Sequence, residues 1–264
     1  MIYMSKLITI AIKQQGNNNS FEATRGFINS LETTSSSFIE KILGTKKEIL
    51  SFETLLIKNG VYNLITLSED IYIYIESQLK FYFPKITIQK DNDPIQDLKM
   101  YATEFALEEK SHYPIQTFEN FPSVDPILNS YEDLLSLQSS NDLTLFQLII
   151  SKKEDGWQDN IINIVENNNK RHDIFSSESV DKNLTLDKVC YPCFDCSLRV
   201  ASTTNKNQIK INNLFNNTER QGSNKIVALP KKSLFNNSLD NLLDRANKKT
   251  ITLNSSEIAT LWHI

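Results

Sequence analysis

Glycine is scarce in this 264-residue chain, and none of its six glycines lies in a phosphate-binding pattern. A Walker A loop needs G-x-x-x-x-G-K-[ST], whose backbone N–H groups and lysine hold phosphates, and a dinucleotide-binding loop needs G-x-G-x-x-G. No glycine here precedes a lysine, and no two are close enough for the second pattern; they are Gly16, Gly26, Gly44, Gly60, Gly156 and Gly222. The sequence therefore excludes both kinds of nucleotide-binding loop.

Long apolar runs and an export signal are also lacking. No run approaches the roughly 18 apolar residues that cross a bilayer. The first residues, MIYMSKLITIAIK, hold a short apolar core that ends at Lys13 and lacks a small-residue cleavage site, so they predict a strand rather than a signal peptide. Without an export signal, the three cysteines indicate a reducing compartment and no disulfides. We therefore expect a cytoplasmic protein, peripheral to a membrane only through partners.

Positive charge is in slight deficit, with 28 lysines and arginines against 32 aspartates and glutamates, and the net charge is −4. Proteins that bind duplex DNA concentrate basic residues on one face to neutralise phosphates. The lysine pairs of this chain are instead scattered among expected loops, at Lys46–Lys47, Lys231–Lys232 and Lys248–Lys249. We expect no binding to duplex DNA by the chain alone.

The best-specified stretch of the chain covers residues 112–162. Asp125 followed by Pro126 is a strong helix start, because the carboxylate accepts a free N–H of the first turn and proline at the first position loses no hydrogen bond. Residues 143–150 are largely apolar on both faces, which predicts an interior strand. Trp157 opens a further helix, and we interpret it as a packing anchor rather than a ligand platform.

The first 96 residues predict a ferredoxin-like sandwich, in which two helices cover one face of a four-stranded antiparallel sheet. Two β-branched and aromatic segments meet at Asn59-Gly60, the best two-residue hairpin signal in the chain. Ser68 is placed to cap the following helix, which stops at Pro84. The order is strand, helix, strand, strand, helix, strand, expected over residues 7–12, 21–43 with a bend at 33–37, 48–57, 61–67, 69–83 and 86–89.

Residues 97–230 predict a second sandwich of the same kind, with an inserted helix and linker. Alternation over residues 100–109 indicates its first strand, and the helix, strand and helix described above follow. Residues 167–183 are rich in asparagine, serine and charge, so we expect a mobile linker there. The remaining elements are a strand at 194–200, a helix at 207–220 and a strand at 225–229.

Residues 231–264 form a C-terminal extension in this interpretation. A helix at 238–246 and a short strand at 250–253 precede a final helix, where Asn254 and Glu257 have the spacing of a capping box. The expected fold class is therefore α+β, with two ferredoxin-like (βαββαβ) sandwiches in tandem and this α/β extension.

Two patches of the chain are similar to one known family. The run HYPIQTF, which begins with His112, Tyr113 and Pro114, is followed by VDPI, a strand, and a Trp-Gln pair at a helix start. This order resembles the uncharacterised domain that precedes the FtsK/HerA-like motor in coupling proteins of conjugative type IV secretion systems, found in Gram-positive and candidate-phyla bacteria. The last patch, TITLNSSEIATLWHI, resembles the segment through which that domain passes into the motor. The similarity covers most of the chain in order, and its motifs are structural rather than catalytic.

The resemblance implies a non-enzymatic scaffold that binds other proteins, namely a FtsK/HerA-like ATPase and subunits of the secretion channel. Because the chain has no Walker A loop, the motor itself is not in it. We expect no cofactor. The alternative is a stand-alone protein that binds single-stranded nucleic acid on a ferredoxin-like fold, although the RNA-binding strand signature K/R-G-F/Y-G/A-F-V-x-F/Y is absent.

Cys190, Cys193 and Cys196 form C-x2-C-x2-C, the one pattern in the chain that resembles a metal site. Thiolate zinc sites close with four ligands, and the nearest further candidate is His172, across the expected linker. Cys196 falls on the inward phase of a strand, where cysteine packs as a small apolar residue. Packing is the preferred interpretation, and a metal site at the three cysteines stays open.

The three histidines, His112, His172 and His263, lie in separate segments without a patterned serine, cysteine or carboxylate partner. The members of a hydrolase triad converge only in space, so the sequence leaves this class open without naming its residues. We expect His112, with Tyr113 and Pro114, to fix the start of the second sandwich. His263 is expected to pack at the end of the last helix.

Overall fold

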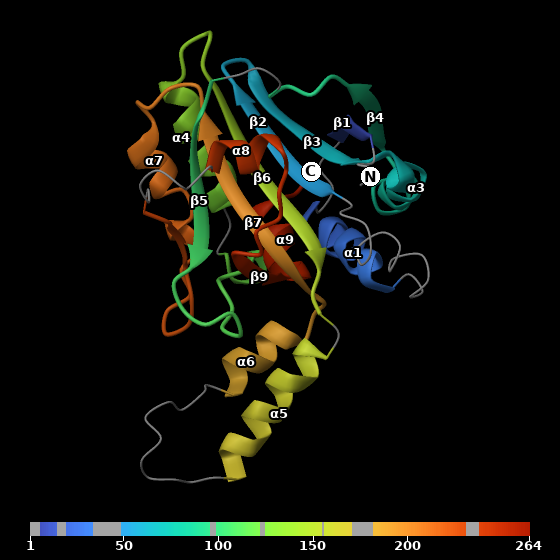
Figure 1. Cartoon of the computed structure of the whole chain (residues 1–264), viewed down its shortest axis with the longest axis vertical. Coiled ribbons are helices and arrows are strands. Elements are labelled where there is room, and N and C mark those ends of the chain that lie inside the picture. Colours follow the sequence, from blue (N-terminus) through green and yellow to red (C-terminus); the bar gives the residue numbers. More distant parts are fainter. Residues whose placement is uncertain are drawn as a thin grey trace.

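One antiparallel sheet runs through the chain (Figure 1). The structure is a computed structural model that describes residues 6–14, 20–33, 49–95, 99–121, 125–154, 156–170, 182–230 and 238–264. Its strands are β1 (Leu7–Gln14), β2 (Leu50–Ile57), β3 (Gly60–Ser68), β4 (Ile86–Asp91), β5 (Tyr101–Leu107), β6 (Leu143–Lys152), β7 (Cys193–Ser202), β8 (Ile226–Ala228) and β9 (Ile251–Asn254). Its α-helices are α1 (Ser20–Thr33), α3 (Tyr72–Tyr82), α4 (Pro126–Leu137), α5 (Trp157–Lys170), α6 (Lys182–Val189), α7 (Gln208–Asn212), α8 (Ser238–Leu243) and α9 (Ser255–Leu261).

The strands follow the order β4-β1-β3-β2-β6-β7-β5-β8, and β9 pairs with the first part of β7. Read inward from the β4 edge, the first four strands take the spatial order fourth, first, third, second. Read inward from the β8 edge, β5, β6, β7 and β8 take the same order among themselves. The two sets join where β2 pairs with β6, from Ser51 opposite Ile149 to Ile57 opposite Leu143. The fold is α+β, and the described strands form a single nine-stranded antiparallel sheet.

The β2–β3 hairpin forms where Asn59-Gly60 predicts it, but its turn lies one residue earlier. Lys58 and Asn59 make the turn, and Gly60 already pairs with Ile57. Gly60 has a φ of +154°, a conformation that L side chains rarely adopt. The glycine is therefore needed at the first strand position rather than at the centre of the turn.

One face of the sheet carries the main apolar core. In the first half, Phe52 of β2 packs against Phe27 of α1 and against Trp262, with ring centroids 6.1 and 4.6 Å apart. In the second half, Phe146 of β6 meets Phe215, with centroids 5.9 Å apart. These five rings belong to one continuous cluster of buried residues, so a single core spans both halves.

The opposite face carries a buried row of polar side chains, Glu53, Gln147, Arg199 and Glu104, which we call the polar row. These residues lie opposite one another on β2, β6, β7 and β5. Arg199 Nη2 donates to Glu104 Oε1 at 3.1 Å, and Gln147 Nε2 donates to Glu53 Oε1 at 3.2 Å. Buried polar groups persist when they are paired in this way.

Residues 238–250, which comprise α8 and the loop after it, form a strap over the polar row (Figure 1). Buried Arg245 forms ion pairs with Glu53 at 2.7 Å and with Asp93 at 2.8 Å. Arg245 has a φ of +49°, a left-handed conformation that is uncommon for a residue with a side chain. Leu242 adds a small second apolar cluster beside the row. The strap therefore covers the face of the sheet that the other helices of the described residues leave open.

Two predicted elements differ in extent. The linker expected at residues 167–183 is helical at both ends, because α5 continues to Lys170 and α6 begins at Lys182, while residues 171–181 lie outside the described part. The helix expected at 207–220 is reduced to α7 and a 3-10 turn at Asn216–Thr218. Asparagines interrupt this stretch, and their side chains compete with helical hydrogen bonding.

Two of the predicted helix starts are confirmed, and the one at Ser68 is not. Ser68 precedes a 3-10 turn at Glu69–Ile71 without a side-chain cap, because its hydroxyl accepts the Ile49 N–H at 3.0 Å. Asp125 accepts the N–H groups of Ile127 and Leu128 at the start of α4, and Asn254 forms the expected capping box with Glu257. The part of the first helix that the sequence predicts beyond residue 33 lies outside the described residues. Every helix in the described part of the chain is too short or too polar to span a membrane.

Candidate interaction site

The segment HYPIQTF, residues 112–118, is largely irregular backbone that lies against α9. Buried N–H groups outside helices and strands need other partners. Fully buried Ile115 donates its N–H to Glu257 Oε1 at 2.8 Å, and Phe118 donates its N–H to Thr260 Oγ1 at 3.0 Å. Both acceptors lie on α9, so the two patches that carry the family resemblance meet in one contact. We call this contact the junction.

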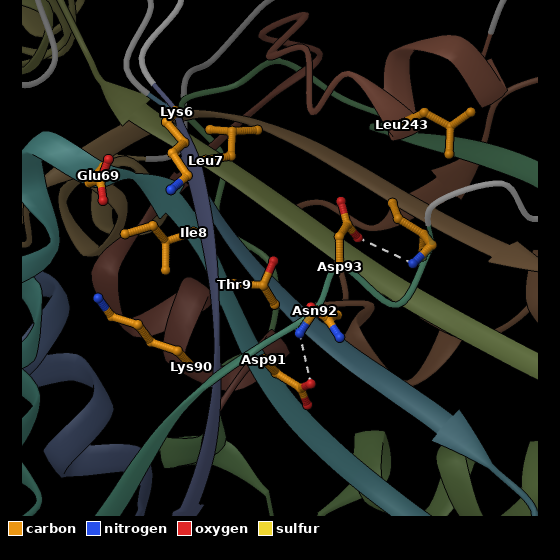
Figure 2. Close-up of a pocket in the computed structure, with 11 residues that line it drawn as sticks. Lys6, Leu7, Ile8, Thr9, Glu69, Lys90, Asp91, Asn92, Asp93 and Leu243 are labelled. Carbon is orange, nitrogen blue, oxygen red and sulfur yellow. Dashed lines mark hydrogen bonds between the residues drawn. The ribbon is translucent and has the colours of Figure 1, made fainter.

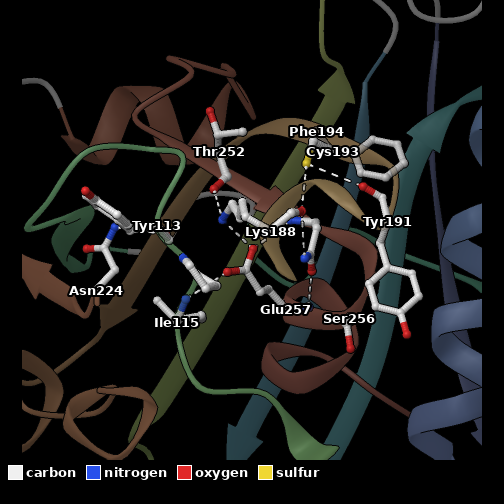
Figure 3. Close-up of polar contacts among 12 residues, drawn as sticks. Tyr113, Ile115, Lys188, Tyr191, Cys193, Phe194, Asn224, Thr252, Ser256 and Glu257 are labelled. Carbon is white, nitrogen blue, oxygen red and sulfur yellow. Dashed lines mark hydrogen bonds and ion pairs between the residues drawn. The ribbon is translucent and has the colours of Figure 1, made fainter. Parts of the chain in front are cut away.

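Glu257 lies at the centre of the junction, as Figure 3 shows. Its Oε2 accepts the Asn254 N–H at 2.7 Å, which completes the capping box at the start of α9. The same oxygen pairs with Lys188 Nζ of α6, and both side chains are fully buried. Lys188 Nζ also donates to the Thr252 carbonyl oxygen at 2.8 Å. The carboxylate thus ties together α6, α9 and the 112–118 segment.

Asp125 and His263 connect the end of α9 to the start of α4. The Asp125 Oδ1 atom accepts the Ile127 N–H at 2.9 Å, while its Oδ2 lies 2.7 Å from His263 Nε2. Phe21 of α1 packs on the His263 ring with centroids 4.2 Å apart. Phe21 also stacks on Phe118, with centroids 4.9 Å apart. His263 therefore packs at the end of the last helix, as the sequence predicts.

A cluster of charges and aromatic rings at the surface adjoins the junction. The guanidinium carbon of Arg25 lies 5.5 Å from the centre of the Phe118 ring and 4.9 Å from that of Tyr191. Arg25 donates to the Tyr191 hydroxyl at 2.9 Å and pairs with Glu22 and Glu119. The Glu22 and Glu119 side chains remain 46% and 42% exposed, so the cluster reaches solvent. We call these five residues the Arg25 patch.

His112, Tyr113 and Pro114 lie where the loop after β5 meets the loop before β8. Asn224 Nδ2 donates to the Tyr113 carbonyl oxygen at 3.1 Å, and Ser223 Oγ donates to that of Pro114 at 2.7 Å. The rings of His112 and Tyr113 are in contact, with centroids 4.4 Å apart. These contacts hold the start of the 112–118 segment in place.

Trp157 begins α5, and its side chain is half-buried. Lys153 Nζ lies 5.4 Å from the centre of its ring. The next residue, Gln158, donates from Nε2 to the carbonyl oxygens of Val189 and Tyr191, each at 2.9 Å. These bonds hold α5 against the end of α6, and the two helices project from the sheet as a hairpin (Figure 1).

The three cysteines differ in environment. Cys190 is exposed whereas Cys193 and Cys196 are buried, and all three thiols donate to backbone carbonyl oxygens. Burial raises the pKa of Cys193 to about 12 and raises that of Cys196 as well, which disfavours the thiolate that binds metal. Among the described residues, no group of three or more His, Cys, Asp and Glu is placed to hold a metal ion. His172 lies outside the described residues.

A surface cavity of about 740 Å³ lies beside the start of β1 (Figure 2). Its charged lining residues are Lys6, Glu69, Lys90, Asp91 and Asp93. Burial alone raises the pKa of Asp93, but hydrogen bonds from Arg245 and its charge outweigh this effect, so the pKa is lowered. Asp93 is therefore committed to the strap, and the opposite charges of the other groups indicate no single class of ligand.

Sequence reasoning did not point to Lys188 or Arg25. Lys188 lies in a short helix that has little amphipathic pattern, so nothing in the sequence marks it as buried. Arg25 follows Glu22 by three residues, a spacing that is common on exposed helix surfaces. The sequence signals that lie in the junction are the HYPIQTF run and the capping pattern of Asn254 and Glu257.

Comparisons of the chain with models of known protein families, with curated proteins and with solved structures found no match.

Proposed function

We propose that the protein is a non-enzymatic interaction module that works beside the FtsK/HerA-like motor ATPase of a conjugative type IV secretion system. The junction is the observation that supports this proposal. The two patches that resemble the coupling-protein domain lie more than a hundred residues apart in the chain. They are nevertheless joined by two hydrogen bonds, because Glu257 and Thr260 of the second patch accept backbone N–H groups of the first. A resemblance that rests on one connected structural unit is stronger than one that rests on separate sequence matches.

The Arg25 patch is the surface that we assign to the partner. Arginine and tyrosine are enriched among the residues that dominate protein interfaces, because they combine apolar area with directed hydrogen bonds. Arg25 holds Phe118 and Tyr191 together and is only 18% exposed, so little side-chain entropy is lost on binding. The patch adjoins the last helix, beyond which the resembled family places its motor.

We further propose that each half of the sheet is a ferredoxin-like unit and that the two units are fused through β2 and β6. The repeated strand order fourth, first, third, second supports this proposal. The chain from α5 to α6 is then an insertion in the second unit, between its second and third strands. Its projecting hairpin offers a second contact for a subunit of the secretion channel.

Copurification from the native cell tests the proposed function. Full-length tagged protein should recover a FtsK/HerA-like ATPase, and Arg25→Ala should lower the recovery about fivefold or more, because it removes the residue that orders both rings. Arg220→Ala is the matched control, since Arg220 forms a comparable surface ion pair with Asp187 on α6. Recovery of no such ATPase, or equal recovery with both variants, would contradict the proposal.

The nucleic-acid alternative gains no support from the described residues. A ferredoxin-like sheet stacks bases on aromatic side chains that are exposed on the face away from its helices. Here that face carries the polar row at its centre, under the strap. We expect no binding to single-stranded oligonucleotides at low salt, where electrostatic binding is strongest.

A further inference from the structure

Helix α3 carries two large apolar side chains that point into solvent. Ile73 is 80% exposed and Phe81 is 74% exposed, and no other described helix has two large hydrophobic residues exposed to this degree. They are eight residues apart, with exposed Ser77 midway between them. Positions four apart lie above one another on a helix, so the three residues form one stripe, which we call the α3 stripe.

The rest of α3 is firmly held, so the stripe is a fixed surface. Ile75 and Leu79 are buried against the sheet. The Tyr74 hydroxyl donates to the Ser30 carbonyl oxygen at 3.0 Å, which joins α3 to α1. Tyr82 also packs so closely on Gly26 that a Cβ there would lie 2.6 Å from its ring. The exposure of Ile73 and Phe81 is therefore not a consequence of helix fraying.

The stripe is complementary to itself. When two copies of α3 pack antiparallel about a two-fold axis at Ser77, Ile73 of one copy faces the partner's Phe81, and the small serines allow the helices to approach. Glu76 and Lys80 flank the stripe on one side, and they form a surface ion pair within the helix at 2.7 Å. The same two-fold axis puts each Glu76 as near to the partner's Lys80 as to the partner's Glu76, so two attractive pairs outnumber one repulsive pair in the register that matches the apolar contacts.

We propose that the α3 stripe binds the α3 stripe of a second copy of this chain, so that the protein forms a two-fold symmetric dimer. This proposal does not depend on the proposed function. Helix α3 has 11 residues and spans about 16 Å. Such a contact is smaller than the roughly 800 Å² per partner that a standard stable interface buries, so the dimer is weak, with dissociation in the micromolar range.

Sedimentation velocity of the full chain from about 1 to 500 μM tests the dimer. The wild-type protein should shift from monomer to dimer as concentration rises. Phe81→Ser and Ile73→Ser should each weaken association about tenfold or more, because each removes one side of the apolar contact. Ile209→Ser is the matched control: Ile209 is 77% exposed but lies on α7, so this variant should associate as the wild type does.

A charge-swap pair tests the register. Glu76→Lys and Lys80→Glu each place like charges across the two-fold axis, so each variant alone should dimerise less well than the wild type. An equimolar mixture should recover the association, because the two lysines of the Glu76→Lys variant then face the two glutamates of the Lys80→Glu variant. Both variants lose the ion pair within the helix, so a mere loss of helix stability would not be rescued by mixing.

Three outcomes would overturn the proposal. A wild-type chain that stays monomeric at the highest concentration lacks the contact. A dimer that Phe81→Ser and Ile209→Ser leave equally intact uses another surface. If Phe81→Ser abolishes the dimer but mixing the two charge variants fails to restore it, the stripe contacts an element of the second copy other than α3.

Discussion

Lys188 and Glu257 are both fully buried, so each depends on the other for the compensation of its charge. Removing two ions from water costs several kcal/mol per ion, and a close pair offsets this cost only when further hydrogen bonds satisfy it. Glu257 meets this condition through the N–H groups of Ile115 and Asn254, and Lys188 through the Thr252 carbonyl oxygen. At the scale of single residues, the fold is therefore sensitive to the loss of either partner of this pair.

We expect Lys188→Met to lower the free energy of unfolding by about 3–5 kcal/mol, because the Glu257 carboxylate remains buried without its cation. The double variant Lys188→Met, Glu257→Gln should recover part of this loss, since the glutamine is neutral. Urea denaturation at neutral pH measures both values. Lys80→Met is the control, because it breaks the exposed pair with Glu76 and should cost less than about 1 kcal/mol. Equal losses of unfolding free energy in Lys188→Met and Lys80→Met would show that Lys188 is not buried with its partner.

The strap shows how an element of the fold is held by one side chain. Arg245 reaches Glu53 on β2 and Asp93 after β4, and its backbone carries a left-handed conformation to do so. Arg199 donates to the carbonyl oxygens of Asn241 and Ala246, so the polar row also binds the strap backbone. The strap is therefore part of the core and not a movable cover.

Asp93→Asn tests this attachment through its pH dependence. Arg245 holds the folded-state pKa of Asp93 below its ordinary value of 3.8. A lowered folded pKa contributes stability that is present above the unfolded pKa and is lost as the pH falls through the folded value. The variant should therefore be less stable than the wild type at pH 7, by about 1 kcal/mol, and the difference should shrink as the pH falls from about 4 to 2.

Thermal or urea unfolding at a series of pH values measures that difference. Asp91→Asn serves as the control, because it removes a neighbouring exposed carboxylate at the same edge of the sheet. A stability difference that stays constant from pH 7 to pH 2 in the Asp93 variant would mean that the carboxylate charge does not hold the strap.

At the scale of the whole molecule, the two halves share a sheet, a core and a polar row. The seam between β2 and β6 pairs residues 51–57 with residues 143–149. Trp262, at the end of the chain, stacks on Phe52 of the first half. The sequence predicts the halves, residues 1–96 and 97–230, as separate domains. Because they share these contacts, one half would lose most of its packing if the other unfolded.

We predict that the chain unfolds in a single cooperative transition. Trp157→Phe leaves Trp262 as the sole tryptophan, whose fluorescence then reports the first half, while far-UV circular dichroism reports the whole sheet. The two probes should give coincident urea transitions, as two-state unfolding requires. Separate midpoints would show that the seam does not couple the halves.

The sequence by itself was enough for features that depend on neighbouring residues. Asp125 with Pro126, and Asn254 with Glu257, start helices because their side chains bind N–H groups within the same turn. Alternation placed β5, and the hairpin signal at Gly60 was one residue from its turn. The first six elements follow the predicted order for the same reason, since periodicity is a local property.

Contacts between distant segments were decided only by the tertiary structure. Glu53 is the one charged residue of β2, and its cation, Arg245, lies 192 residues away, so no spacing rule relates the two. Lys188 and Glu257 are separated by 69 residues in the same way. The pairing of β2 with β6 joins the two predicted domains in one sheet. An edge strand pairs through backbone hydrogen bonds, which many different sequences offer, so the sequence does not show which strand its partner is.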